Sequence, residues 1–407
     1  MLLLNEYAPI AGKNEVDEIC MIADKLRGTR IVNINSTSVG GGVAEILSRM
    51  VLLMRDLGLD VKWEVIKGGD KFFAVTKKFH NALHGKKETF EREEFQTYMD
   101  TVESNVPDLS LDSDVVFVHD PQPAALVRHR REYDNRWVWR CHIDLSERSD
   151  DVWDFLRPFV EDYDACAFSS PTFSQKLTCK QVLIAPSIDP LSDKNKFLPQ
   201  KTVYETLAQF KIDPEKPIVT QVSGYDYLKD PSGVIDAYRM VKPYVDCQLV
   251  LAGGSATDDP EGAKVLAEVK EKAADDPDIH VLCLPPTSNL EINALQRGST
   301  VILQKSLKEG FGLTVSEGLW KAKPVIASAV GGIPYQIAHK YSGILTHSIE
   351  GTAFWLKQLL QSPDYAKKLG ENGREHVRQN FLLTRHIRDY ILLFLSLRHA
   401  DKDIVYL

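Results

Sequence analysis

The chain has 407 residues, enough for two or three domains with large cores. Hydrophobic residues make up 43% and charged residues 26%, a composition typical of a folded globular protein rather than a disordered chain. The 49 Lys and Arg against 57 Asp and Glu leave a formal net charge of −8, so the chain lacks the basic field that nucleic-acid binding usually needs.

Membrane insertion and export are also disfavoured by the sequence. No window approaches the roughly 18 consecutive apolar residues of a membrane span. Residues 1–4 are apolar but run into Asn5 and Glu6 without a basic start or a cleavage site, so we expect no signal peptide. The six cysteines are scattered and form no C-x-x-C pair. This pattern predicts reduced thiols in a cytoplasmic protein.

Short β-branched runs alternate with amphipathic segments along the first half of the chain. The pattern predicts a strand at 30–35, a glycine run at 40–42 and a helix at 43–57. Further strands are predicted at 61–66, 114–119, 137–142, 165–169 and 181–185. Strands separated by helices imply parallel pairing under helical cover, hence an open, doubly wound sheet.

A polar stretch at 192–200 then predicts an interdomain linker. The alternation restarts after it, and strands are predicted at 217–222, 248–253, 280–284, 300–304, 324–328 and 343–346. A last amphipathic segment at 382–396 is predicted to be a helix that packs on the protein. We therefore expect two Rossmann-like domains, with a ligand bound beyond the carboxyl ends of the strands and facing the cleft between the domains.

The sharpest motif runs from Glu309 to Glu317 and has Gly310-Phe311-Gly312-Leu313-Thr314 inside it. It follows a predicted strand, and its second half begins an amphipathic helix. Glycines let the backbone approach a ligand closely, and the amides at a helix start suit a diphosphate. Two carboxylates at different depths could bind hydroxyls on different parts of one ligand. Taken alone, the motif fits a glycine turn with a capping glutamate equally well.

Polar residues also follow two neighbouring strands of the first predicted sheet. His119-Asp120-Pro121-Gln122 comes directly after the strand at 115–118, and His142 follows the strand at 137–141. Ligands of parallel sheets bind at such strand ends. One histidine in this position is more often structural, but two such groups at neighbouring strand ends favour a ligand site.

Two other segments have sequences that are typical of phosphate or metal sites. The glycine run at 40–42 lacks the G-x-G-x-x-G spacing of a dinucleotide site. Asp112-Ser113-Asp114 resembles a metal-binding D-x-D motif, but it precedes its strand, which predicts a solvated turn. No other cluster has metal-ligand spacing, and no G-x-S-x-G elbow marks a serine hydrolase. We expect no protein metal site.

The spacing of Glu309 and Glu317 around Gly-Phe-Gly resembles the paired-glutamate motif of retaining GT-B glycosyltransferases, with glycosyltransferase family 4 as the best match. The resemblance covers essentially the whole chain. It implies an α/β GT-B fold of two Rossmann-like domains facing across a cleft. Residues 1–190, with a C-terminal helix at about 382–407, would form the acceptor-binding domain. Residues 191–381 would form the nucleotide-sugar-binding domain.

The same resemblance implies roles for single residues. Glu309 would bind donor-sugar hydroxyls, Glu317 the ribose, His142 the donor sugar near its reacting carbon, and Asp120 the acceptor. The catalytic residues implied in this way are Glu309, His142 and Asp120. The donor-binding residues are Gly41, Gly42, Lys229, Gly310, Phe311, Gly312, Leu313, Thr314 and Glu317. The acceptor-binding residues are Asp120, Gln122 and Glu45.

One position departs from the family pattern. The family has an arginine about five residues before the lysine that matches Lys229, and here Gly224 stands in its place. One cation of the diphosphate clamp is therefore missing. We expect Lys305 or Lys308 to substitute for it, or the helix dipole and Lys229 to suffice.

Several short runs are similar to those of one subgroup, the trehalose synthases of the glycosyl-transferring type. These runs lie at 40–45, 119–123, 139–144, 258–262 and 330–333. The implied reaction transfers glucose from a nucleoside diphosphate glucose to free glucose, giving α,α-trehalose with retained configuration. No cofactor would be required, and Mg²⁺ would at most stimulate.

The partners implied by this resemblance are the two sugar substrates, with no nucleic acid and no membrane, and a homodimer stays open. A trehalose phosphorylase or another hexosyltransferase of the same fold is one alternative. A non-catalytic sugar-nucleotide-binding protein is the other, because Gly224 replaces the expected arginine.

Overall fold

The computed structural model describes residues 3–38, 41–254, 260–274 and 276–399. Gly40 of the glycine run, and Asp258 and Asp259 of the run at 258–262, lie outside the described residues. The chain divides into two compact units, Met1–Ser187 with Leu383–Leu407, and Ile188–Leu382. Among the described helices, none is both long and apolar enough to cross a membrane.

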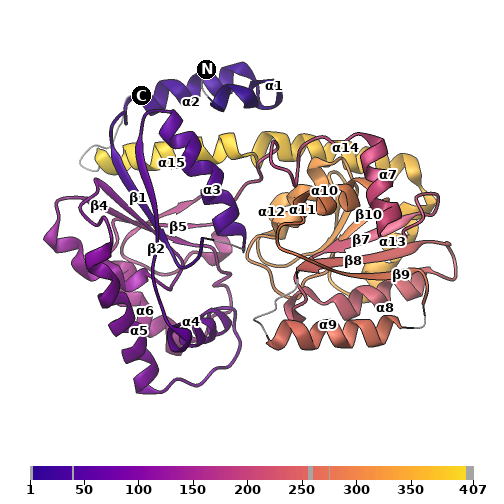
Figure 1. The fold of residues 1–407 in the computed structure, drawn as a ribbon, viewed down its shortest axis with the longest axis horizontal. Coiled ribbons are helices and arrows are strands. Elements are labelled where there is room, and N and C mark those ends of the chain that lie inside the picture. The colour runs from indigo at the N-terminus through magenta and orange to yellow at the C-terminus, as the bar shows by residue number, and fades with distance from the viewer. Residues whose placement is uncertain (1–2, 39–40, 255–259, 275, 400–407) are drawn as a thin grey trace. The chain divides into compact units, whose positions relative to one another are not determined.

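The first unit is built on a six-stranded, wholly parallel sheet with the order β2-β1-β3-β4-β5-β6 (Figure 1). Its strands are β1 (Arg30–Asn35), β2 (Asp60–Val65), β3 (Val115–His119), β4 (Arg136–Cys141), β5 (Ala165–Phe168) and β6 (Lys180–Leu183). Its α-helices are α1 (Ala8–Ala11), α2 (Lys13–Asp24), α3 (Gly41–Asp56), α4 (Asp70–Leu83), α5 (Arg92–Asn105), α6 (Asp150–Glu161) and α15 (Leu383–Arg398). Its 3₁₀ segments are η1 (Leu3–Tyr7), η2 (Val106–Asp108), η3 (Ala124–Glu132) and η4 (Pro171–Phe173).

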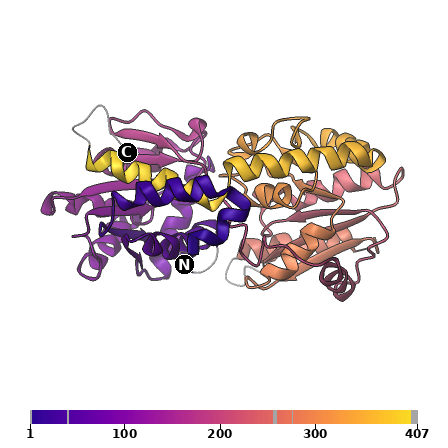
Figure 2. The same ribbon diagram turned by 90° about the horizontal axis from the view of Figure 1, so that it is seen from above.

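The inner strands β1, β3, β4 and β5 are almost wholly buried, as expected for parallel strands with helices on both faces, whereas the edge strands β2 and β6 are partly exposed. Val32 and Ile34 point into a core shared with α4, α5 and α6. Because side chains alternate along a strand, Asn33 points to the opposite face, as does Phe117 on the neighbouring strand. Phe117 packs edge-on against Tyr390 of α15, with ring centroids 4.9 Å apart. Figure 2 shows α15 beside α2, which confirms that the C-terminal helix packs on the first unit.

The second unit repeats this architecture with the strand order β12-β11-β10-β7-β8-β9, again all parallel. Its strands are β7 (Ile218–Val222), β8 (Gln248–Gly254), β9 (Ile279–Leu284), β10 (Val301–Gln304), β11 (Val325–Ser328) and β12 (Ile344–Thr346). Its helices are α7 (Gln200–Gln209), η5 (Tyr227–Lys229), α8 (Pro231–Val241), α9 (Pro260–Ala273), α10 (Asn289–Gly298), α11 (Leu313–Trp320), α12 (Ile333–Gln336), α13 (Ile349–Gln361) and α14 (Pro363–Asn380). Separate cores cover the two faces of the sheet, which confirms the predicted doubly wound layout.

The polar stretch predicted as a linker is packed against the second unit rather than loose. Asn195 is 1% exposed, and its carbonyl accepts a hydrogen bond of 3.2 Å from Trp320 Nε1. The Lys196 carbonyl accepts from Asn293 Nδ2 at 2.8 Å and from Arg297 Nη2 at 2.9 Å. These side chains of α10 and α11 satisfy the backbone of an irregular segment, which explains why a polar sequence is fixed in place.

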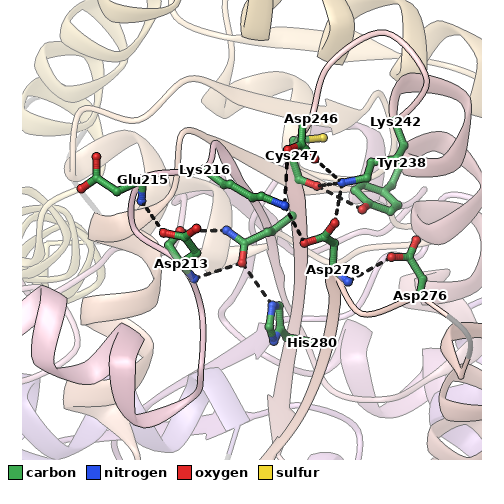
Figure 3. Close-up of polar contacts among 11 residues, drawn as sticks. Asp213, Glu215, Lys216, Tyr238, Lys242, Asp246, Cys247, Asp276, Asp278 and His280 are labelled. Carbon is green, nitrogen blue, oxygen red and sulfur yellow. Dashed lines mark hydrogen bonds and ion pairs between the residues drawn. The ribbon is translucent and has the colours of Figure 1, made fainter.

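Two lysines and two aspartates close a ring of ion pairs where β7, β8 and β9 begin (Figure 3). Lys242 Nζ lies 2.7 Å from Asp246 Oδ1 and 2.6 Å from Asp278 Oδ2. Lys216 Nζ lies 3.3 Å from Asp246 Oδ2 and 3.2 Å from Asp278 Oδ1. Each carboxylate is therefore held by both cations, and the ring ties together the starts of three strands at the edge opposite their carboxyl ends.

An Asp278→Asn variant is expected to lower the free energy of unfolding by about 1 kcal/mol at neutral pH. The two lysines hold the pKa of Asp278 below its ordinary value of 3.8. A depressed carboxylate pKa stabilises the fold above the ordinary value, and this contribution is lost as the pH falls through the lower, folded-state pKa. Urea unfolding of wild type and variant should therefore differ at pH 7 and converge in acid. Asp246→Asn is the matched control, because its 67%-exposed carboxylate should contribute less. An equal loss for Asp278→Asn at both pH values would contradict this account.

Candidate active site

The glycine-rich loop of residues 305–312 connects β10 to α11 and is fixed by neighbouring backbone. Gly312 has a φ of 80°, a left-handed conformation that glycine adopts without strain. The Gly332 amide donates to the Gly310 carbonyl at 3.1 Å. A Cβ at Gly332 would lie 2.7 Å from that oxygen, so only glycine allows this approach. Gln336 Nε2 also donates to the Gly312 carbonyl at 3.3 Å. The loop is therefore held in one shape.

Helix α11 begins directly after Gly312 and directs its N-terminus toward this loop. The first amides of a helix have no acceptors within the helix, and they lie at the positive end of its dipole. Thr314 Oγ1 donates to Gln304 Oε1 at 2.9 Å, which anchors the helix start to the end of β10. The predicted phosphate-binding residues Gly310 to Thr314 thus form a rigid turn followed by a helix N-terminus.

Glu309 and Lys229, predicted from separate motifs, contact each other. Lys229 Nζ donates to Glu309 Oε2 at 2.7 Å, and Ser306 Oγ donates to the same oxygen at 3.2 Å. Glu309 is only 9% exposed. Lys229 ends η5, a segment after β7, whereas Glu309 follows β10, and β7 and β10 are neighbours in the sheet. The parallel pairing of these strands explains how residues 80 positions apart meet.

Glu317 lies deeper, on the second turn of α11, and is 1% exposed. Its Oε2 accepts a hydrogen bond of 3.1 Å from Gln296 Nε2 on α10. Its Oε1 lies 3.6 Å from Lys194 Nζ, in the segment that precedes α7. These partners neutralise a buried carboxylate, as burial requires. The structure thus holds the Glu317 carboxylate within the protein, between Gln296 and Lys194.

The position of the missing arginine is open. Gly224 follows β7, is exposed, and a Cβ built on it would meet nothing within 4 Å. Lys305, one of the expected substitutes, is 7% exposed, and its Nζ pairs with Asp230 Oδ2. Asp230 thus already partners Lys305, as Glu309 partners Lys229, and the substitution of Lys305 or Lys308 for the missing arginine stays a prediction.

In the first unit, Asp120 follows β3 in a left-handed conformation with a φ of 66°. Its amide donates to the Arg140 carbonyl at 2.8 Å, and its Oδ1 accepts from the His142 amide at 2.8 Å. Trp139 Nε1 donates to the Asp120 carbonyl at 2.9 Å. This strained backbone is thus held from three sides by β4 and the residue after it. Burial raises the pKa of the Asp120 carboxyl to about 7, against the opposing effects of the His142 amide and Arg140.

His119 and His142 lie side by side at the ends of β3 and β4. His119 Nδ1 is 3.3 Å from His142 Nε2, and the two rings are nearly parallel, with an interplanar angle of 19°. Burial and the nearby Arg140 lower the pKa of His119 to about 3. The same two causes hold the pKa of His142 well below its ordinary value. Both rings are therefore neutral at physiological pH.

Arg140 stands beside these groups as a fully buried cation. It is 0% exposed, and its Nη2 donates to Ser169 Oγ at 3.2 Å. Its Nε and Nη1 find no hydrogen-bond partner in the part of the chain that the structure describes. Sequence reasoning read Arg140 as part of a strand and gave it no role. Arg140 pairs in register with His119, on the face of the sheet that also carries Asn33. This gathering of polar residues on one face of buried strands was the signal that could have identified it.

The remaining predicted residues lie in the first unit. Gln122 lies after β3, and its Oε1 is buried without a partner among the described residues. Glu45 is exposed in α3, the helix that begins at Gly41, and Gly42 is also exposed. The D-x-D sequence lies at the opposite edge of the sheet, where Asp112 and Asp114 pair with Arg30. No group of three or more His, Cys, Asp or Glu side chains among the described residues is arranged to hold a metal ion.

Known proteins resemble this chain along almost its full length. Residues 33–175 match the family "Trehalose synthase, N-terminal domain", and residues 204–376 match "Glycosyl transferases group 1". Trehalose synthases from Pyrococcus horikoshii and Thermococcus litoralis are 45% and 44% identical to it. Those matches cover 97% of this chain and 96% and 97% of the relatives. A trehalose phosphorylase from Pleurotus pulmonarius is 29% identical, and the match covers 92% of this chain and 58% of the phosphorylase.

Solved structures share the fold at low sequence identity. A sucrose-phosphate synthase from Thermosynechococcus elongatus superposes with a TM-score of 0.73 at 19% identity. The match covers 91% of this chain and 100% of the synthase chain. A UDP-forming α,α-trehalose-phosphate synthase from Burkholderia xenovorans, in complex with glucose-6-phosphate, gives 0.72 at 13% identity, covering 90% and 100%. The architecture is thus the GT-B fold expected from the sequence.

Proposed function

The chain belongs to the trehalose synthase family of glycosyltransferases, and from that premise we propose that it transfers glucose from a nucleoside diphosphate glucose to free glucose, forming α,α-trehalose. The observation that carries the proposal is the contact of Lys229 with Glu309 beside the rigid loop and helix start of residues 310–314. A cation and helix amides suit a diphosphate, and an adjacent carboxylate suits sugar hydroxyls. These groups of the second unit support the proposal that it binds a sugar nucleotide.

We assign to these groups the stabilisation of the departing diphosphate. As the bond between the glucosyl C1 and the phosphate oxygen breaks, negative charge grows on the leaving group. The helix amides and Lys229 stabilise that charge, an electrostatic role that requires no rearrangement of the site. Glu309 fixes the donor ring by its hydroxyls, and Glu317 the ribose. The scheme draws on no required cofactor, and Mg²⁺ would act only as a stimulating ion.

We assign acceptor orientation to the first unit, with Asp120 binding the hydroxyl that attacks C1 and His142 on the donor-sugar side. Gln122 and Glu45 join Asp120 on the acceptor side, and Gly41 and Gly42 assist the donor. The new bond forms between C1 and the acceptor oxygen, and the acceptor proton passes to the departing phosphate oxygen. Attack on the face that the leaving group vacates retains the α configuration without a protein nucleophile.

The rate of transfer is expected to rise with pH through about 7. Because burial raises the pKa of Asp120 to about 7, its carboxylate is ionised, and able to accept the hydroxyl's hydrogen bond, only above that value. The depressed pKa values of His119 and His142 keep those rings from titrating in this range. A profile of kcat/KM against pH for the wild type should show one ascending limb and a plateau. A profile that is flat from about pH 5.5 to 8.5 would contradict the role of Asp120.

The reaction itself is tested by incubating the protein with carbon-13-labelled glucose and, in separate samples, UDP-, ADP- and GDP-glucose. The expected product by NMR is the α,α-1,1 disaccharide, with one nucleoside diphosphate released for each trehalose formed. Trehalose formed from maltose alone, without a nucleotide, would contradict the proposed donor. Donor binding by calorimetry without turnover for any acceptor would identify a non-catalytic sugar-nucleotide-binding protein.

A phosphorylase is the second candidate function, favoured by the similarity to the Pleurotus trehalose phosphorylase. The same helix N-terminus that suits a diphosphate would also suit inorganic phosphate. In that reaction phosphate attacks C1 of one glucosyl unit of trehalose and releases free glucose. Glucose 1-phosphate formed from trehalose and inorganic phosphate, with no product from any nucleotide donor, would favour this function over the first.

A further inference from the structure

A line of three buried side chains leads from the interior of the first sheet to His142. His119 Nε2 lies 3.1 Å from Asn33 Oδ1, and His119 Nδ1 lies 3.3 Å from His142 Nε2. The three residues come from β1, the end of β3 and the residue after β4. Asn33 and His119 are 4% and 1% exposed, whereas His142 is only partly buried. The line therefore begins in the core and ends at a side chain that solvent or a ligand can reach.

The hydrogen bonds along this line have one direction. Asn33 Nδ2 points to the Lys62 carbonyl at 3.4 Å, which leaves its Oδ1 facing His119. A carboxamide oxygen only accepts, so His119 Nε2 must carry a proton. A neutral imidazole has one N–H, so His119 Nδ1 is an acceptor and His142 Nε2 must donate to it. His142 is then left with a bare lone pair on Nδ1.

The surroundings keep both rings neutral, which this reading requires. Phe117 packs against His119 with ring centroids 4.5 Å apart, on the side that α15 covers. The buried cation of Arg140 opposes a second positive charge nearby. Across the described residues, no protein group makes a hydrogen bond to His142 Nδ1. The acceptor nitrogen is therefore available to a group from outside the chain.

We propose that Asn33 and His119 are positioning residues that lock His142 with its proton on Nε2, so that Nδ1 accepts a hydrogen bond from a substrate hydroxyl. The inference rests on the proposed function, because it places a sugar hydroxyl at His142. It goes further by stating which ring nitrogen binds and in which protonation state. A ring fixed in one tautomer needs no rearrangement when the substrate arrives.

The direct test is long-range proton–nitrogen NMR of the full-length protein labelled with nitrogen-15 histidine at pH 7.5. The His142 signals are assigned by their loss in a His142→Gln variant. The expected pattern for His142 is a protonated Nε2 and an unprotonated Nδ1. The reverse pattern, or two nitrogens averaged to the same intermediate shift, would overturn the proposal.

Asn33→Asp should reverse the hydrogen bond between His119 and His142. A carboxylate at this position favours a doubly protonated His119, whose Nδ1–H would then donate to His142 Nε2 and move the remaining His142 proton to Nδ1. We expect the NMR pattern of His142 to invert and kcat to fall by about 10- to 100-fold, with little change in KM for the donor. An unchanged His142 spectrum in this variant would overturn the proposal.

Asn33→Leu covers the case in which the core does not tolerate aspartate, since leucine keeps the size of the side chain without its oxygen. This variant should give mixed His142 tautomers. Asn35→Leu is the matched control. Asn35 is equally buried on the same face of β1, but its amide bonds the Thr37 carbonyl and Trp63 instead, so the His142 pattern should not change. The expected NMR pattern in a protein with no transferase activity would contradict the proposed function alone, because the spectrum reports the tautomer without any substrate.

Discussion

A Glu309→Gln variant is expected to lose about 10³-fold in kcat/KM while keeping its fold. The carboxylate is almost fully buried and accepts hydrogen bonds from Lys229 and Ser306. Glutamine has the same size, but it offers one neutral oxygen and an NH₂ group that cannot pair with Lys229. The variant thus loses the charged acceptor for the donor-sugar hydroxyls, and it leaves Lys229 without its counter-ion.

Steady-state kinetics with the best nucleoside diphosphate glucose measure this effect, and circular dichroism checks the fold. Glu371→Gln is the control, because Glu371 is exposed on α14 and its carboxylate lies 3.9 Å from Lys367. That variant should keep the wild-type rate. His142→Ala is expected to lose most transfer as well. Wild-type rates in both Glu309→Gln and His142→Ala would refute the assignment of these residues to the site.

The second large effect is expected for Lys229→Ala, which should lower kcat/KM by about 10²-fold, mainly through a higher KM for the donor. Gly224 stands where the family has a second cation, and Lys305 is bound to Asp230. Lys229 and the amides at the start of α11 would therefore have to balance much of the negative charge of the diphosphate. Lys264→Ala, on an exposed part of α9, is the control and should leave the donor KM unchanged.

The open space at Gly224 allows a variant that is expected to gain donor affinity. A side chain there would meet nothing within 4 Å of its Cβ, so arginine should be accommodated without strain in the surrounding backbone. Gly224→Arg in the Lys229→Ala background is expected to recover part of the lost donor affinity. If Lys229→Ala leaves the donor KM at its wild-type value, Lys229 does not bind the diphosphate, whatever the arginine does.

The fold was predictable because most strands are short, largely buried runs between helices. The run at 30–35 became β1 with the same bounds, and the run at 248–253 became β8 with one residue added. Parallel strands buried on both faces leave little freedom for other arrangements, so pattern alone was sufficient. The terminal helix was predictable for a different reason, because its apolar positions repeat at helical spacing.

The partners of the site residues were not predictable in the same way. Lys194 is one cation in a polar stretch, and only the packing of that stretch on α10 and α11 places it beside Glu317. Likewise, no spacing rule pairs Asn33 with His119, because the register between β1 and β3 is set by the whole sheet. Sequence patterns indicate which residue types follow strands. The side-chain contacts depend on how distant elements pack.

The most direct test of the account is a crystal structure of the protein with a nucleoside diphosphate bound. The diphosphate oxygens should lie within hydrogen-bond distance of the backbone amides of residues 310–314 and of Lys229 Nζ. A diphosphate bound elsewhere, with Lys229 still paired to Glu309 and the start of α11 unoccupied, would contradict it.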